Sequence, residues 1–107
     1  MKERKMISVL LILVIFVGAS FSIFAVTREE KEDAYWSGYR EGYSLARVNG
    51  KSSDTHIYTE GGYAANRMYR KTTNENRALK TEYRSGFIQG WHDKEDGKPN
   101  QYFERTD

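Results

Sequence analysis

An uncharged segment near the start of the chain limits what the rest of the sequence can fold into. The twenty-one residues from Met6 to Val26 carry no charge, and they follow a basic stretch at residues 1–5. At ~1.5 Å per helical residue the segment reaches about 31 Å, roughly the thickness of the hydrocarbon core of a bilayer. The sequence therefore predicts a helix that crosses a membrane once, with its backbone hydrogen bonds satisfied internally.

The charges beside this segment predict its orientation. Lys2, Arg4 and Lys5 precede it, and basic residues stay on the cytoplasmic side of a membrane. We therefore expect the N-terminus in the cytoplasm and the C-terminal eighty residues outside the cytoplasmic membrane.

The same pattern also describes a secretory signal peptide, which would be removed. Cuts are conceivable after Ala19, Ser22 or Ala25, but none of these sites has an Ala-x-Ala arrangement. The apolar run is also longer than the ~7 to 15 residues typical of a signal peptide. We expect residues 1–27 to form an uncleaved signal anchor, with a cleaved signal and a secreted protein as the alternative.

Composition excludes several classes of protein. The chain has no cysteine, which excludes disulfides, a thiolate metal site and a thiol nucleophile. From residue 27 onward it has fourteen Lys/Arg and fourteen Asp/Glu, so the exported part lacks the basic footprint of a nucleic-acid-binding protein. Between Arg67 and Arg84 six basic residues stand against two acidic ones. We interpret this local excess as solvated helix faces or, alternatively, as a site for an anionic surface or ligand.

A nine-residue pattern occurs twice, at residues 35–43 and 83–91. Both copies read Tyr-x-Ser-Gly-aromatic-x-x-Gly-aromatic, and each is followed by a polar tract that ends in Gly-Lys. The aromatic residues recur every four positions, which is helical spacing. Glycine inside a helix costs roughly 0.5–1 kcal/mol relative to alanine, so four such glycines need a compensating reason. Close approach of another backbone or ring is the natural one.

The repeat therefore predicts two helices that pack through rows of glycine, either within one chain or between copies. A ligand groove lined by the rings is the alternative. The predicted partner-binding residues are Tyr35, Gly38, Tyr39, Gly42, Tyr43, Tyr83, Gly86, Phe87, Gly90 and Trp91.

Stop and start signals place the helices. We expect a helix from Glu29 to Val48 that ends at a left-handed Asn49-Gly50 cap, a shorter one from Gly62 to Lys71, and a last one from Glu75 to Asp96. The predicted fold is mainly α: a transmembrane or signal helix followed by a small extracytoplasmic region of two to three helices with Gly-xxx-Gly and aromatic faces. Residues 28–98 would form this domain, and residues 99–107 a loose tail.

The exported region offers little aliphatic material for a core. Outside the uncharged segment it has six large aliphatic residues and twelve aromatic ones, so its core must consist mostly of rings. A region of about eighty residues without disulfides or metal is near the size at which a single core is marginal. We therefore expect self-association to add burial.

The sequence contains no recognisable catalytic constellation. Its only histidines are His56 and His92, and the carboxylates near His92 lack the spacing of a metal site. We predict no metal, no cofactor and no enzymatic activity, with glycan hydrolysis by a pair of carboxylates as a remote alternative.

The leading functional prediction is a single-pass membrane-anchored protein whose helices bind a partner protein or another copy. The alternative is a binding module for an envelope polymer, in which rings stack on sugars and the basic stretch meets an anionic chain. Nucleic acid is not an expected partner.

Overall fold

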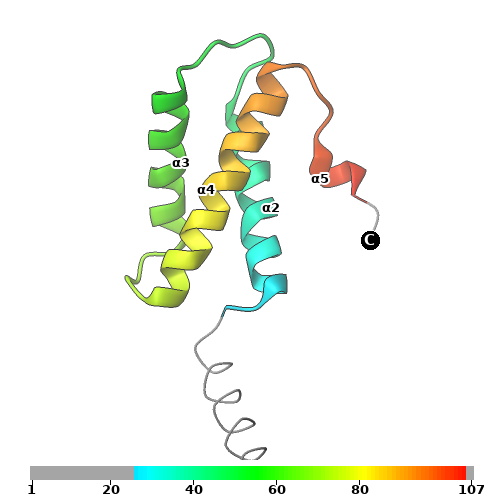
Figure 1. Ribbon diagram of the computed structural model, residues 1–107. Helices are drawn as coiled ribbons and strands as arrows, with labels where there is room; N and C mark the ends of the chain where they lie inside the picture. Colours follow the sequence, from blue (N-terminus) through cyan, green and yellow to red (C-terminus); the bar gives the residue numbers. More distant parts are fainter. Residues whose placement is uncertain (1–25, 106–107) are drawn as a thin grey trace, which may run out of the picture.

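The computed structural model describes residues 26–105, which form four helices and no strand (Figure 1). The helices are α2 (Arg28–Leu45), α3 (Asp54–Met68), α4 (Asn74–Glu95) and α5 (Gln101–Glu104). The prediction of a mainly helical fold is confirmed for this part of the chain. The predicted membrane or signal segment lies outside the described residues. Within residues 26–105, no helix is both long and apolar enough to cross a bilayer.

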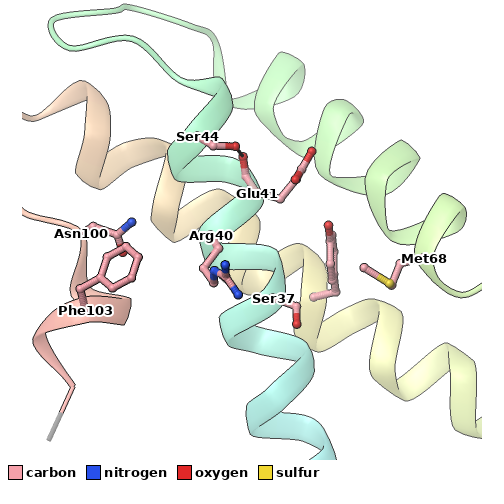
Figure 2. A pocket seen from close by; sticks show the side chains of 8 residues that line it. Ser37, Arg40, Glu41, Ser44, Met68, Asn100 and Phe103 are labelled. Carbon is pink, nitrogen blue, oxygen red and sulfur yellow. Dashed lines mark hydrogen bonds between the residues drawn. The ribbon is translucent and has the colours of Figure 1, made fainter.

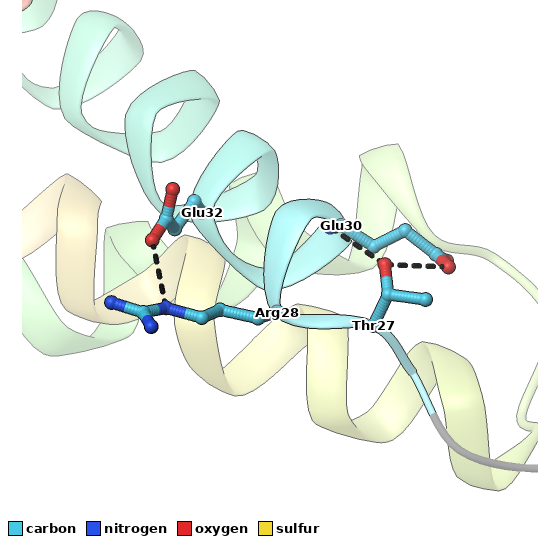
Figure 3. Close-up of polar contacts among 4 residues, drawn as sticks. All are labelled: Thr27, Arg28, Glu30 and Glu32. Carbon is cyan, nitrogen blue, oxygen red and sulfur yellow. Dashed lines mark hydrogen bonds and ion pairs between the residues drawn. The ribbon is translucent and has the colours of Figure 1, made fainter. Parts of the chain in front are cut away.

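Local side-chain bonds determine where α2 begins (Figure 3). The Thr27 hydroxyl accepts a hydrogen bond from the Glu30 backbone N–H at 3.1 Å and donates one to the Glu30 carboxylate at 3.0 Å. The Arg28 guanidinium lies 3.3 Å from the Glu32 carboxylate one turn further along. The hydroxyl satisfies an N–H group that has no partner within the helix, and residues four apart are neighbours on a helix surface. The helix therefore starts one residue before the predicted Glu29.

The end of α2 differs from the prediction. The helix was expected to continue to Val48, but it ends at Leu45 because Ala46 has an extended backbone. Asn49 does have a left-handed φ of 62°, as its position before a glycine indicated. Its N–H donates to the carbonyl of Glu95 in α4 at 2.9 Å. This left-handed residue thus ties the α2–α3 loop to the end of α4 instead of capping α2.

The helix α3 is longer than predicted. The sequence pattern indicated a helix from Gly62 to Lys71, whereas α3 begins at Asp54 and ends at Met68. Gly61 and Gly62 lie in its middle, not at its start. A Cβ at Gly61 would lie 3.0 Å from the Phe87 ring, so these glycines let α3 approach α4 closely.

The helix α4 matches its predicted range within one residue at each end. The Thr73 hydroxyl accepts a hydrogen bond from the Asn76 N–H at 3.0 Å and caps the start. Gly97, just beyond the end, has a φ of 74°, the left-handed conformation that glycine adopts without strain.

The two copies of the repeat lie on α2 and α4, which run side by side in the same direction (Figure 1). The intervening α3 runs in the opposite direction and covers one side of this helix pair. Its Ile57, Ala64 and Ala65 pack with the α4 rings Phe87 and Trp91 in the hydrophobic core. Ile57 and Phe87 have no exposed surface.

The C-terminal segment is not the loose tail that the sequence predicted. Residues 99–105 contain the short helix α5, which lies beside α2 (Figure 1). The Gln101 N–H donates to the Tyr39 hydroxyl at 3.0 Å, and the Tyr43 hydroxyl donates to the Lys98 carbonyl at 2.7 Å. Two tyrosines of α2 therefore hold the backbone at Lys98 and at Gln101, which residue composition does not reveal.

Candidate functional site

The four glycines of the repeat lie in the contact between α2 and α4. A Cβ on any one of them would overlap the backbone carbonyl of a residue on the other helix. Gly38 faces Tyr83, Gly42 faces Phe87, Gly86 faces Tyr35 and Gly90 faces Tyr39. Only glycine lets two helix backbones approach this closely. The close approach occurs within one chain, which was the first of the two packing alternatives.

These contacts are reciprocal. The fourth position of each copy of the repeat, Gly38 or Gly86, meets the first position of the other copy, Tyr83 or Tyr35. For two parallel helices, such an exchange corresponds to an approximate twofold axis that runs along the pair. The internal repeat thus builds a two-helix unit in which both halves use the same close contact.

The predicted partner-binding rings are largely enclosed by this packing. Tyr39, Tyr83, Phe87 and Trp91 are buried, and Tyr35 and Tyr43 are half-buried. Partner binding by these ten residues stays a prediction. Most of their surface is used inside the chain, and among the rings Tyr35 and Tyr43 keep the larger exposed parts.

A buried carboxylate joins α2, α4 and the C-terminal segment. Asp93 is 4% exposed, and it accepts hydrogen bonds from the Tyr39 hydroxyl at 2.6 Å and from the Gln89 amide at 2.8 Å. The Tyr39 hydroxyl in turn accepts from the Gln101 N–H. Two donors compensate the carboxylate for its lost hydration. The sequence indicated only that carboxylates lie near His92, whose ring nitrogen Nε2 lies 3.8 Å from the Asp54 carboxylate.

Two buried phenols have altered acidity. Burial raises the pKa of Tyr39, and its hydrogen bond to Asp93 raises that pKa further. Burial, assisted by the negative charge of Glu41, raises the pKa of Tyr83 to about 12. Both hydroxyls are therefore neutral at ordinary pH, and that of Tyr39 donates one hydrogen bond and accepts another.

The two histidines make separate contacts and do not form a shared metal site. His56 packs edge-on against the Trp91 ring, with 5.8 Å between ring centroids. Within residues 26–105, no three His, Cys, Asp or Glu side chains lie close enough together to hold a metal ion.

The exposed face of α2 carries an open groove of about 440 Å³, called here the α2 groove (Figure 2). Phe103 of α5 and Met68 of α3 flank it, and they are 73% and 55% exposed. The remaining lining residues are Ser37, Arg40, Glu41, Ser44, Tyr83 and Asn100. Of these lining residues the sequence indicated only Tyr83 as partner-binding, because the spacing within α2 does not show which elements flank it.

Comparisons with protein-family models, with curated proteins and with solved structures give no significant match to this chain.

Proposed function

We propose that this chain is a single-pass membrane-anchored interaction protein. In this proposal residues 6–26 hold it in the cytoplasmic membrane, and the helical domain outside binds a partner protein or another copy. The observation that carries the proposal is the α2 groove, where Phe103 and Met68 expose large apolar surfaces on either side of a helix. Large apolar side chains that stay exposed around a groove are typical of interaction sites.

The surroundings of the rings favour a protein partner over an envelope polymer. Sugar binding needs a free ring face, and Tyr39 and Trp91 are buried. The half-buried rings beside the groove are each covered on one face by a guanidinium group. That of Arg40 lies 4.6 Å from the centre of the Tyr102 ring, and that of Arg105 lies 4.9 Å from the centre of the Trp36 ring.

Anchoring in the membrane would be what allows a weak contact to bind the partner. Confinement to a membrane raises the effective concentration of a partner held in the same membrane, so a small contact surface suffices. The helix pair would act as the rigid support that presents the groove.

The test uses the 107-residue chain expressed in bacteria with a C-terminal tag. We expect the membrane fraction to contain the unprocessed mass, and amine- or photo-cross-linking in intact membranes to give protein adducts. Phe103→Asp should reduce these adducts, whereas Tyr63→Asp, on an exposed part of α3 outside the groove, should not.

Two results would overturn the proposal. A soluble product that begins near Ser20, Ile23 or Val26 would show a cleaved signal. Salt-sensitive binding to purified cell-wall polymer, without any protein adduct, would favour the polymer-binding alternative.

A further inference from the structure

We infer that the α2 groove binds the α2 groove of a second copy of this chain, with the two α2 helices parallel and related by a twofold axis along them. The parallel direction rests on the proposed membrane anchoring, because two copies in one membrane leave it in the same sense. Three features of the groove carry the inference: its charges, its apolar edges and its small central residues.

The charges lie on opposite edges of α2. Arg40 extends toward α5, where it shares a recess with Trp36 and Tyr102. Glu41 extends toward α3, where it lines a recess with Met68. Neither Arg40 nor Glu41 forms an ion pair with another residue in the described part of the chain.

A parallel twofold arrangement makes these edges complementary. Rotation about an axis along the helices places the left edge of one helix against the right edge of the other. Arg40 of each copy would then meet Glu41 of the other, which gives two equivalent ion pairs. An antiparallel arrangement would instead place Arg40 against Arg40 and Glu41 against Glu41. The charge pattern therefore favours the parallel pair.

The apolar side chains at the two edges of the groove are also complementary in a parallel pair. Phe103 stands on the Arg40 side of α2 and Met68 on the Glu41 side, and both lie beside the turn that carries the two charges (Figure 2). A rotation about an axis along α2 preserves height, so Phe103 of one copy would meet Met68 of the other, twice. A thioether against a ring is a favourable contact. The two most prominent apolar side chains of the groove would thus cover each other.

The centre of the groove is small enough for the helices to approach. Ser37 and Ser44 are seven residues apart and share one face of α2. The Ser44 hydroxyl donates to the Glu41 carbonyl of its own helix at 2.8 Å, so it needs no partner from another molecule. Small residues at a crossing allow close helix packing, as the glycines already do between α2 and α4.

Single cysteines test this arrangement, because the chain has none of its own. In a parallel pair, each of these serines lies opposite its counterpart in the other copy. We expect Ser37→Cys and Ser44→Cys each to give a disulfide-linked dimer when membranes holding the 107-residue chain are oxidised. The matched control is Thr59→Cys, an exposed residue of α3 that does not line the groove. A maleimide label must reach all three thiols, so that a missing dimer reflects geometry and not access.

The outcomes separate this inference from the proposed function. Accessible cysteines at 37 and 44 that give no dimer, in a chain that still forms Phe103-dependent adducts with another protein, would overturn the inference and leave the proposed function standing. A disulfide that forms only between co-expressed Ser37→Cys and Ser44→Cys chains would show an antiparallel pair and also overturn it. Loss of the chain from the membrane would contradict the proposed anchoring itself.

Charge reversal supplies an independent test on the Ser44→Cys background. Arg40→Glu or Glu41→Arg alone places like charges at both pairs, and we expect about a fivefold smaller dimer fraction. The double variant with both reversals restores opposite charges and should recover the dimer. A merely local effect of losing the Arg40 contact with Tyr102 would persist in the double variant, and that result would overturn the assignment of the two ion pairs.

Discussion

The two sides of the α2–α4 pair begin from the same repeat but are covered in different ways. On one side Phe87 and Trp91 of α4 are covered by the helix α3. On the other side the equivalent residues of α2 are Tyr39 and Tyr43, which are covered by residues 97–105. The repeat positions are the same, and the main chemical difference is a phenol in place of an apolar or indole ring.

The difference shows how side-chain chemistry selects the covering segment. Phe87 offers only apolar surface, and an amphipathic helix with small residues, such as Gly61, fits against it. The hydroxyls of Tyr39 and Tyr43 instead need polar partners, which the backbone in the middle of a helix cannot provide because its own hydrogen bonds are internal. The backbone around Lys98 and Gln101 provides them.

The two covering segments, which contain α3 and α5, nevertheless share the same order of features. Each starts with a Gly-Lys dipeptide and then a helix N-cap three residues after the glycine, at Ser53 for α3 and at Asn100 for α5. The second repeat position makes a cation–ring contact on each side, with the roles exchanged. Arg84 lies 4.2 Å from the centre of the Tyr58 ring, whereas Trp36 is the ring beneath the Arg105 guanidinium. The described chain thus consists of two similar units, each a long helix followed by a loop and a covering helix. The covering helix of the second unit, α5, is short.

Removing the central ring of the α3 side should have the largest effect. Phe87 is fully buried between α3 and its own helix, so Phe87→Ala should lower the free energy of unfolding by about 3 to 5 kcal/mol. Thermal melts of the 107-residue chain in detergent, followed by near-UV circular dichroism, would measure this. Tyr63→Ala, at a ring that is 57% exposed, should change stability by less than about 0.5 kcal/mol. Equal losses for the two variants would contradict the core assigned to this side.

Separating the helix pair should affect both sides together. A Cβ at Gly86 would overlap the Tyr35 carbonyl, and backbone cannot move aside as a side chain can. We expect Gly86→Ala to cost about 3 kcal/mol despite the higher helix propensity of alanine. The same melts measure it, with Ser85→Ala as the control because Ser85 is the exposed neighbour. A stabilised Gly86→Ala variant would show that the close contact is absent.

The covering on the α2 side should open selectively when its phenol is removed. Tyr39→Phe leaves the Asp93 carboxylate with one donor fewer and the Gln101 N–H without its acceptor, which should cost about 1 to 3 kcal/mol. Hydrogen exchange should accelerate at residues 97–105 and stay slow in α3. Tyr43→Phe loses only the exposed bond to the Lys98 carbonyl and should have a smaller effect. An equal acceleration of hydrogen exchange in α3 would show that α3 and residues 97–105 do not open independently.

The sequence predicted the elements that depend on local signals. The range of α4 followed from start and stop signals, which the structure shows as the Thr73 cap and the left-handed Gly97. The glycine packing followed from the four-residue spacing. Both depend on residues that lie within one helix or next to its ends in the sequence.

What the sequence did not predict depends on residues far apart in the chain. Nothing near Asp93 indicates that Tyr39, fifty-four positions away, donates to it, or that the segment after Pro99 is held by tyrosines of α2. The α2 groove likewise exists only because Met68 and Phe103 come to opposite sides of one helix. Such sites require the tertiary arrangement.

The smallest predicted effect concerns the phenol on the α3 side and appears only at high pH. The pKa of Tyr83 is about 12 in the folded chain against an ordinary value of 10.0. The folded state therefore holds the phenolic proton more tightly, so this contribution to stability is fully present below pH 10 and is lost as the pH rises through 12. Melts across that interval should show stability falling with pH, and Tyr83→Phe should reduce the slope, whereas Tyr63→Phe should not. The raised pKa of Tyr39 acts in the same direction, so some slope should survive in Tyr83→Phe; an unchanged slope would contradict the burial of the Tyr83 hydroxyl beside Glu41.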